Sequence, residues 1–261
     1  MCKECGCGNV ARDVQINGHA HMHNHEHAHA HQHHAHGDHE PGGPSQTIDL
    51  NRSLLEKNDR HAERNRGYFH AKKVLVLNVL SSPGSGKTTL IRETAARLAG
   101  RLRVGVIVGD LATDNDAQKL RQAGVPVVQI TTGTVCHLDA DMIASAVEQM
   151  DLDPLNLLII ENVGNLVCPA DFDLGESLRV VLLSTTEGED KPLKYPPMFH
   201  SADAVVITKS DLAKAARFNH EQALASLHHV SHHATIFEVS AKTGDGMKKW
   251  LDYLVKQRAD W

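Results

Sequence analysis

A glycine-rich segment between a strand pattern and a helix pattern constrains this chain more than any other feature. Residues 81–89 read Ser-Ser-Pro-Gly-Ser-Gly-Lys-Thr-Thr. The apolar run 74–80 before it predicts a buried strand, and residues 90–98 after it have the pattern of an amphipathic helix. This order of strand, glycine-rich turn, Gly-Lys-Thr and helix is the context that a phosphate-binding loop requires. One departure is Ser81, which occupies the place of the usual first glycine.

Each part of this loop has a defined chemistry toward a nucleotide. The glycines let backbone N–H groups converge on phosphate oxygens, and the N-terminus of the following helix adds a favourable dipole. Lys87 is expected to reach the outer phosphates, and the Thr88 hydroxyl is expected to bind Mg²⁺. The residues predicted to hold the phosphates are Gly84, Ser85, Gly86, Lys87, Thr88 and Thr89.

Charge and composition exclude several classes of protein. The formal net charge of −5 over 261 residues gives no basic footprint, so we expect no nucleic-acid partner. No apolar run approaches the ~20 residues that span a bilayer, and the N-terminus lacks the apolar core of a secretory signal. Five cysteines, an odd number, do not suggest a disulfide framework. We therefore expect a cytoplasmic protein whose cysteines serve as metal-binding thiolates.

Two metal-binding patterns precede the predicted strand 74–80. Cys2, Cys5 and Cys7 lie within six residues, and three thiolates with the terminal amine would supply four donors to Ni²⁺, Cu²⁺ or Zn²⁺. More than half of the 20 histidines then lie between positions 19 and 39. Such a polar tract is expected to be disordered without metal and to bind several divalent ions weakly.

The chain divides into three parts by pattern. Residues 1–45 form the predicted metal-binding tail and linker, residues 46–73 a helical lead-in, and residues 74–261 the nucleotide-binding domain. In the domain, apolar strands without alternation are separated by helices, which predicts an α/β fold with a mostly parallel sheet covered on both faces. The expected strands are 74–80, 104–108, 125–130, 157–160, 180–184, 204–208 and 235–239. Ligands bind such sheets beyond the carboxyl ends of the strands.

Residues at two of these strand ends predict GTP rather than ATP. Thr208-Lys209-Ser210-Asp211 is similar to the Asn-Lys-x-Asp guanine-reading motif of GTPases, with Thr208 in place of Asn. The Asp211 carboxylate would accept from the N1–H and the amine of guanine, while Lys209 would lie along the base. An adenine base would present the wrong donor pattern to Asp211. The second loop predicted to contact the base comprises Ser240, Ala241 and Lys242.

Three carboxylates are candidates for the hydrolytic chemistry together with Lys87. Asp110 follows the expected strand 104–108 and is expected to enter the Mg²⁺ shell directly or through water. Asp116 is expected to orient water, and Glu161 ends the strand 157–160 in the Walker-B-like place. No arginine finger is evident in the pattern, so we expect slow intrinsic turnover.

A second set of metal ligands falls in the loops beside this predicted nucleotide site. Cys136 and His137 follow the strand 125–130 and are expected to open a helix over 137–150, while Cys168 lies seven residues beyond Glu161. These side chains can ligate one metal ion, whose coordination a symmetry-related chain could complete. The alternative is a pair of buried structural thiols.

Taken together, the tail cysteines, the histidine tract, the phosphate loop, the Cys-His pair and the base motif resemble the HypB family. This family comprises GTPases that assist nickel insertion into NiFe hydrogenase. The resemblance implies a GTP-dependent homodimer of the SIMIBI class of P-loop proteins. It also implies a nickel site at Cys2, Cys5 and Cys7 and a nickel or zinc site at Cys136, His137 and Cys168. The implied partners are the zinc-containing accessory protein HypA, the nickel chaperone SlyD and the hydrogenase large-subunit precursor.

Three alternatives stay open at this stage. A UreG-type GTPase would deliver nickel to urease, although the Cys-x-x-Cys-Gly-Cys head favours HypB. A nickel store would use the histidine tract alone, and an ATP-dependent enzyme would not need Asp211. Our hypothesis is that GTP binding at Lys87 and Thr88 closes two chains together and alters the geometry around the second metal site.

Overall fold

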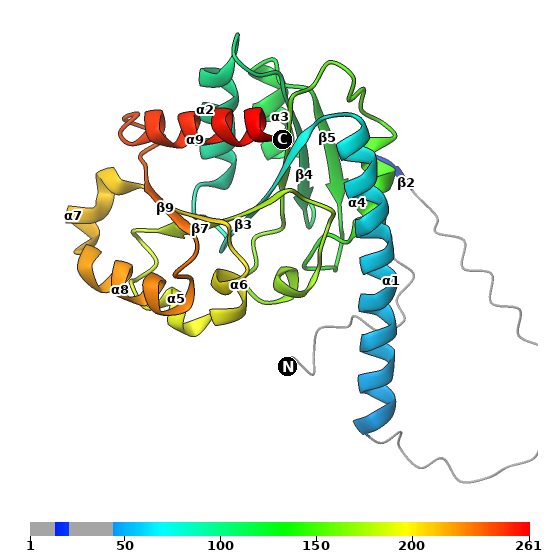
Figure 1. Cartoon of the computed structure of the whole chain (residues 1–261), viewed down its shortest axis with the longest axis horizontal. Helices are drawn as coiled ribbons and strands as arrows, with labels where there is room; N and C mark the ends of the chain where they lie inside the picture. The colour runs from blue at the N-terminus through cyan, green and yellow to red at the C-terminus, as the bar shows by residue number, and fades with distance from the viewer. Residues whose placement is uncertain (1–13, 21–43) are drawn as a thin grey trace, which may run out of the picture.

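The computed structural model describes residues 14–20 and 44–261 (Figure 1). Side chains are described from Val14 to Gly18 and from Arg52 onward. The predicted ligands Cys2, Cys5 and Cys7, and the histidine tract beyond Ala20, lie outside the described residues. None of the helices within the described ranges is both long and apolar enough to cross a membrane.

One sheet organises the described part of the chain, with the strand order β2-β1-β5-β4-β6-β3-β7-β8-β9. All pairs among the seven strands from β3 to β9 are parallel, which confirms the predicted α/β fold. These strands are β3 Leu75–Leu80, β4 Val104–Asp110, β5 Val127–Thr131, β6 Leu157–Glu161, β7 Leu178–Ser184, β8 Ala204–Thr208 and β9 Thr235–Glu238. Because β3 lies between β6 and β7, the loops that follow those two strands flank the loop that follows β3.

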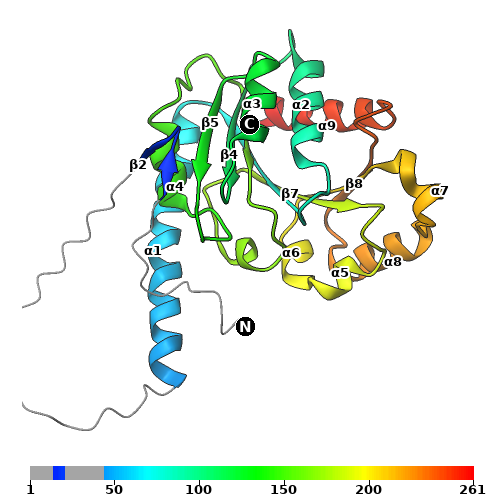
Figure 2. The ribbon, with the colours of Figure 1, turned by 180° about the vertical axis from the view of Figure 1, so that it is seen from behind.

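Helices cover both faces of the sheet, as Figure 1 and Figure 2 show from opposite sides. Leu75, Leu77 and Val79 of β3 pack into a cluster with one set of helices, whereas Val74 and Val76 pack into a cluster on the other face. The first set is α2 Lys87–Leu98, α3 Asn115–Gln122 and α9 Met247–Asp260. The other face carries α1 Pro44–Ala71, α4 Ala140–Val147, α6 Pro196–His200 and α8 His220–Val230. The shorter helices are η1 Cys168–Asp171, α5 Lys191–Lys194, η2 Ser210–Leu212 and α7 Ala213–Ala216.

Helix α1, which the sequence predicted as the helical lead-in over 46–73, runs along one side of the domain, and its first turns project beyond it (Figure 1). Two buried asparagines attach it to neighbouring loops. Asn58 accepts a hydrogen bond from the Ala140 N–H at 2.9 Å, and its amide donates to the Asp173 carbonyl at 2.8 Å. Asn65 donates to the carbonyls of Ala140 and Leu174. Helix α1 therefore braces the loop before α4 and the loop after η1.

A short hairpin at the edge of the sheet was not predicted. Strands β1 Gln15–Ile16 and β2 His19–Ala20 are joined by Asn17 and Gly18, which have φ angles of 50° and 81°. Asn-Gly is the pair that favours a tight two-residue hairpin turn. Strand β1 pairs antiparallel with β5, with Gln15 opposite Thr131, and Ile16 is only 1% exposed. Gln15, the first residue of β1, therefore lies at the carboxyl end of β5.

Replacing Ile16 by alanine should loosen this hairpin from the sheet. The Asn17 N–H donates to the Gln129 carbonyl at 2.9 Å, so its exchange with solvent reports on opening of the β1–β5 pair. Loss of the buried side chain should lower the free energy of opening by about 2 kcal/mol and speed exchange of this amide about thirtyfold. The control is Gln15→Ala, because the Gln15 side chain is exposed. Equal acceleration in both variants would contradict docking through Ile16.

Candidate functional site

The loop between β3 and α2 has the backbone shape of an anion site. Gly84 and Gly86 have φ angles of 74° and 97°, a conformation that glycine adopts without steric cost. Gly86 is the N-cap of α2, and no side chain caps this helix end. The first N–H groups of α2 therefore remain available to a ligand, and the helix dipole makes an anion the favoured one.

The lysine of this loop is held by the serine that replaces the usual glycine. Lys87 is 8% exposed, and its Nζ donates to the Ser81 Oγ at 2.8 Å. The Ser85 hydroxyl also donates to Ser81 Oγ, and the Ser81 hydroxyl donates to the Ser82 carbonyl. Burial lowers the pKa of Lys87, against the opposing effect of the Glu161 carboxylate. Bound phosphate would give this buried ammonium a charged partner in place of a hydroxyl.

Glu161 and Thr88 form the clearest candidate for a magnesium site. The Thr88 hydroxyl donates to Glu161 Oε1 at 2.7 Å, while Glu161 Oε2 is buried with no hydrogen-bond partner within the described residues. Burial raises the pKa of Glu161 to about 7, even though Thr88 and Lys87 oppose the shift. A buried carboxylate with an unpaired oxygen beside a hydroxyl matches the hard oxygen donors that Mg²⁺ requires. The two residues fit the ion.

The two aspartates predicted for hydrolysis, Asp110 and Asp116, lie close enough for their charges to raise the pKa values of Lys87 and Glu161. Asp110 folds back on its own loop, since its Oδ1 accepts hydrogen bonds from the N–H groups of Ala112 and Thr113. Asp116 lies in the first turn of α3 and forms an ion pair with Lys119 at 2.8 Å. Their roles in hydrolysis stay predictions, and Glu161 is the carboxylate that contacts Thr88 directly.

The predicted base motif contacts the phosphate loop and opens onto a cavity. The Thr208 hydroxyl donates to the Ser85 carbonyl at 2.7 Å, and Lys209 Nζ donates to the Gly84 carbonyl at 2.7 Å. Thr208 thus ties the motif to the loop although it replaces an asparagine. Asp211 lines a cavity of about 220 Å³ that extends to the start of α2. The other lining residues are Ser85, Gly86, Thr89, Leu90, Thr208, Lys209, Leu212, Val239, Ala241 and Lys242.

The second predicted base loop meets the first at this cavity. The buried Ser240 hydroxyl donates to Asp211 Oδ1 at 2.7 Å, and its oxygen accepts from the Thr243 N–H at 3.1 Å. Ala241 and Lys242 line the same cavity. The structure therefore brings Asp211, Ser240, Ala241 and Lys242 together around one volume next to the phosphate loop.

Two charged residues of the loop after β7 were missed by the sequence reasoning. Lys191 Nζ donates to the Ser82 Oγ at 3.2 Å and lies 4.0 Å from a carboxylate oxygen of Glu187. Burial raises the pKa of Glu187, opposed by Ser82 and by the nearby lysines. Because β7 is the neighbour of β3, its carboxyl end has to lie beside the phosphate loop. The strand order was the signal for these residues, and the sequence alone does not provide it.

The three predicted ligands of the second metal site are brought together. The sulfurs of Cys136 and Cys168 lie 3.0 Å apart, and one ligand atom from each of Cys136, His137 and Cys168 lies within 4.8 Å of the others. His137 is 3% exposed, and its ring stacks on Phe172 at a centroid distance of 3.9 Å. Two thiols and an imidazole suit a borderline ion such as nickel or zinc, so the residues fit such an ion.

One detail of this site differs from the sequence prediction. Cys136 and His137 were expected to open a helix, but α4 begins at Ala140, and Asp139 caps it by accepting a hydrogen bond from the Met142 N–H at 2.9 Å. The capping preference of Asp139 fixes the start of the helix. Cys136 and His137 therefore lie in the irregular segment before α4, where their side chains meet Cys168.

A row of direct contacts joins the phosphate loop to these ligands. A Cβ built on Gly164 would come within 3.0 Å of the Pro83 backbone, so the loop after β6 lies tightly against the phosphate loop. The neighbouring Asn165 side chain donates to the Cys136 carbonyl at 3.2 Å. The same loop continues into η1, which begins at Cys168. Pro83 is therefore in direct contact with the segment that leads to both cysteines.

Replacing Glu161 by glutamine should stabilise the nucleotide-free protein above neutral pH. Between pH 4.5 and about 7 the folded state keeps a proton on Glu161 that the unfolded chain releases, so stability falls as the pH rises. Glu161→Gln removes this loss of stability. The free energy of unfolding of the variant should therefore exceed that of the wild type by a small amount near pH 5 and by about 3 kcal/mol at pH 8. Urea unfolding at both pH values measures it. The exposed Glu148→Gln is the control, and a pH-independent difference would refute the charge-burial explanation.

The sequence of this chain matches known proteins along most of its length. Residues 75–238 match the family model described as CobW/HypB/UreG, nucleotide-binding domain. The hydrogenase maturation factor HypB of Escherichia coli (strain K12) is 50% identical over 223 residues, which cover 85% of this chain and 77% of that relative.

Two solved structures have the same fold. The crystal structure of HypB from Helicobacter pylori in complex with nickel is 41% identical, has a TM-score of 0.75, and is matched over 78% of this chain and 96% of that one. The crystal structure of the hydrogenase maturation factor HypB from Archaeoglobus fulgidus is 39% identical, with a TM-score of 0.73 over 78% and 99% of the two chains. The chain therefore belongs to the CobW/HypB/UreG family of nucleotide-binding proteins and, within it, to the HypB group.

Proposed function

We propose that this chain hydrolyses GTP to GDP and phosphate and uses that cycle to deliver nickel during hydrogenase maturation. The names of its relatives support the pathway, and the nickel complex of the Helicobacter pylori relative supports the metal. The observation that carries the proposal is the row of contacts from Pro83 through Gly164 and Asn165 to Cys136. This row links a phosphate sensor and a metal site by packing and one hydrogen bond.

The hydrolytic roles follow from the geometry of the phosphate loop. Lys87 neutralises charge on the outer phosphates after leaving Ser81, and the N-terminus of α2 binds the phosphate oxygens. Thr88 and Glu161 would hold Mg²⁺, which supplies further charge neutralisation when bound. Asp110 and Asp116 remain proposed for the magnesium shell and for orienting water. Burial of Lys87 keeps these charge interactions strong because little water screens them.

Nickel is the cargo in this scheme, and the ligands Cys136, His137 and Cys168 are its proposed site, with zinc as the competing ion. Three ligands leave a four-coordinate ion incomplete, which favours completion by a second copy of the chain in a GTP-dependent homodimer. The tail ligands Cys2, Cys5 and Cys7 are proposed to load the protein with nickel. The tail precedes Val14, at the carboxyl end of β5, and that end leads toward Cys136.

The proposed partners are those of the maturation pathway: a HypA-type accessory protein, the chaperone SlyD and the hydrogenase large-subunit precursor. A second candidate function is nickel delivery to urease, because a relative from Helicobacter hepaticus, 41% identical over 226 residues, is named hydrogenase/urease maturation factor HypB. The two functions differ in which enzyme loses activity when the gene is deleted.

Guanine recognition can be tested at Asp211. Asp211→Asn should move the nucleotide preference from GTP to xanthosine triphosphate by about two orders of magnitude or more, because the amide presents a donor where guanine needs an acceptor. The Asn oxygen would still accept the Ser240 hydrogen bond, which protects the fold. Turnover rates with both nucleotides measure the shift. Asp245→Asn is the matched control, since this exposed carboxylate accepts only from nearby Thr243. Unchanged preference would refute the assignment.

The proposal depends on coupling between the bound nucleotide and the affinity for nickel, and this coupling can be measured. In the full-length protein with Cys2, Cys5 and Cys7 replaced by alanine, nickel affinity should differ about fivefold or more between GDP and a non-hydrolysable GTP analogue. A further Cys168→Ala substitution should abolish the difference, whereas Val167→Ala, at an exposed neighbouring position, should preserve it. Competition titration of nickel gives the affinities, and the variant with Cys168→Ala gives the contribution of the other sites. Equal affinity with the two nucleotides would show that no coupling exists.

A further inference from the structure

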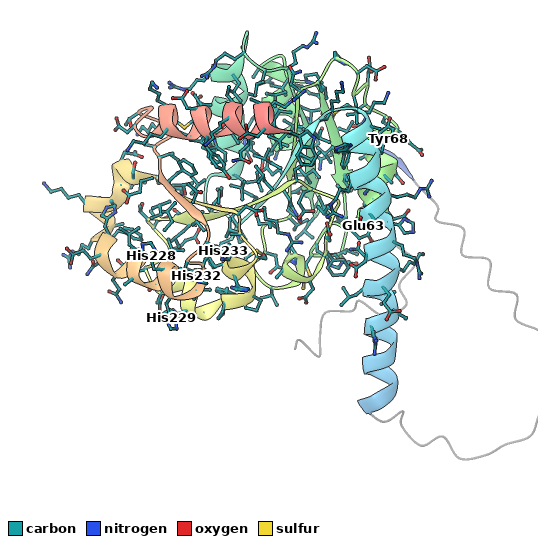
Figure 3. The ribbon with its side chains drawn as sticks, viewed as in Figure 1. Glu63, Tyr68, His228, His229, His232 and His233 are labelled. Atoms are coloured by element: carbon teal, nitrogen blue, oxygen red, sulfur yellow. The ribbon has the colours of Figure 1, made fainter. Side chains whose placement is uncertain are left out.

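Five exposed histidines gather where two helices end, far along the chain from the N-terminal tract. Helix α6 ends at His200, and α8 has His228 and His229 in its last turn. His232 and His233 follow in the turn that leads into β9. Figure 3 shows the last four of these residues on one flank of the domain, away from Glu63 and Tyr68 of α1. We call His200, His232 and His233 the histidine triad.

Two of the three ring pairs in the triad have a spacing near the one that a shared ion needs. The His200 and His233 centroids lie 5.5 Å apart, and the His232 and His233 centroids also lie 5.5 Å apart. Two imidazoles bound to one tetrahedral ion at 2.0–2.1 Å per nitrogen have centroids about 5 Å apart. The rings now lie edge to face, so exposed side chains must turn to direct their nitrogens at one point. The two measured ring separations are close to the separation that a shared ion requires.

The His200 ring makes a hydrogen bond that is typical of metal-binding histidines. Its Nδ1 lies 3.1 Å from the Val230 carbonyl oxygen, which can only accept, so Nδ1 carries the proton. The lone pair is then on Nε2. Metal-binding histidines almost always donate their other N–H to a carbonyl or carboxylate in this way, because that bond fixes the tautomer. The carbonyl belongs to the C-terminus of α8, where the helix dipole also favours a cation.

The turn that carries the other two rings is anchored. Ser231 is 1% exposed, and its N–H donates to the Leu227 carbonyl at 2.7 Å. The Ala234 N–H donates back to the Ser231 carbonyl at 3.2 Å. These bonds hold the backbone of His232 and His233 while both side chains stay exposed. An ion that binds here has to order side chains only, which lowers the entropic cost.

We propose that His200, His232 and His233 bind one borderline divalent metal ion, of the nickel and zinc class, at a surface site. Exposed imidazoles without thiolate suit such ions and hold them more weakly than a site containing cysteine. The triad precedes β8 and β9 and so lies at the amino end of the sheet, opposite the nucleotide and Cys136. It is an additional site, separate from the nucleotide-linked one, and it does not depend on the proposed function.

Chemical modification of each histidine in the full-length protein tests the site. Diethyl pyrocarbonate acylates a free imidazole lone pair, and mass spectrometry gives the rate at each position. Added Zn²⁺ should slow the reaction of all three triad histidines at one common concentration. His70 is the control, because it is exposed on α1 and its ring contacts that of Trp261, away from the triad. Triad rates that respond to Zn²⁺ no more than His70 does would overturn the proposal.

A substitution separates a shared ion from independent binding by single rings. In His233→Gln the Zn²⁺ concentration that halves the His200 rate should rise about tenfold or more, because a ligand has been lost. His70→Gln should leave the His200 response unchanged. Both residues are exposed, so neither variant threatens the fold. A His200 response that is identical in wild type and His233→Gln would show that the rings bind metal separately, and would refute the shared site.

Discussion

Burial of Glu161 beside Lys87 and Thr88 is the interaction on which the rest of this structure depends. Burial makes the ionised Glu161 carboxylate, whose pKa is raised to about 7 and whose second oxygen has no partner within the described residues, costly, and it does the same to the Lys87 ammonium on the Ser81 hydroxyl. Both become favourable when a magnesium nucleotide supplies the opposite charges. This difference in interaction with a magnesium nucleotide is a source of the energy by which a bound nucleotide can rearrange the neighbouring segments.

The arrangement of the sheet decides which neighbours respond. Strand β3 lies between β6 and β7, so the loop after β6 packs against Pro83 and the loop after β7 brings Lys191 to Ser82. The first of these loops also holds the Cys136 backbone through Asn165 and leads to Cys168. Helix α1 braces the far side of the same segments through Asn58 and Asn65. The candidate metal ligands and the candidate phosphate loop are therefore joined by direct contacts.

Several features could be read from residues alone, and others could not. The phosphate loop, the parallel strands and the Asp211 motif follow local patterns of glycine, apolar runs and polar strand ends, and the structure brings their members together. Asn17-Gly18 was a readable hairpin signal, but its setting beside a histidine tract concealed it. Asp139, an ordinary helix cap, set the start of α4 at Ala140 and left Cys136 and His137 outside the helix. Glu187 and Lys191 had no local signal, because their importance comes from strand order.

The sequence by itself determined the chemistry available to this protein: a phosphate-loop pattern, a carboxylate of the kind that can accept from guanine, and thiol and imidazole groups of the kind that nickel and zinc bind. These are local properties, set by side-chain type and spacing. Only the tertiary structure decided which groups meet, because parallel strands bring distant loops to one edge. It placed the Ser81 hydroxyl within hydrogen-bond distance of Lys87 and packed Gly164 against Pro83. It also brought the rings of His200 and His233, which lie near the ends of two different helices, into contact. Proximity across the fold is a property of packing, and no spacing along the chain encodes it.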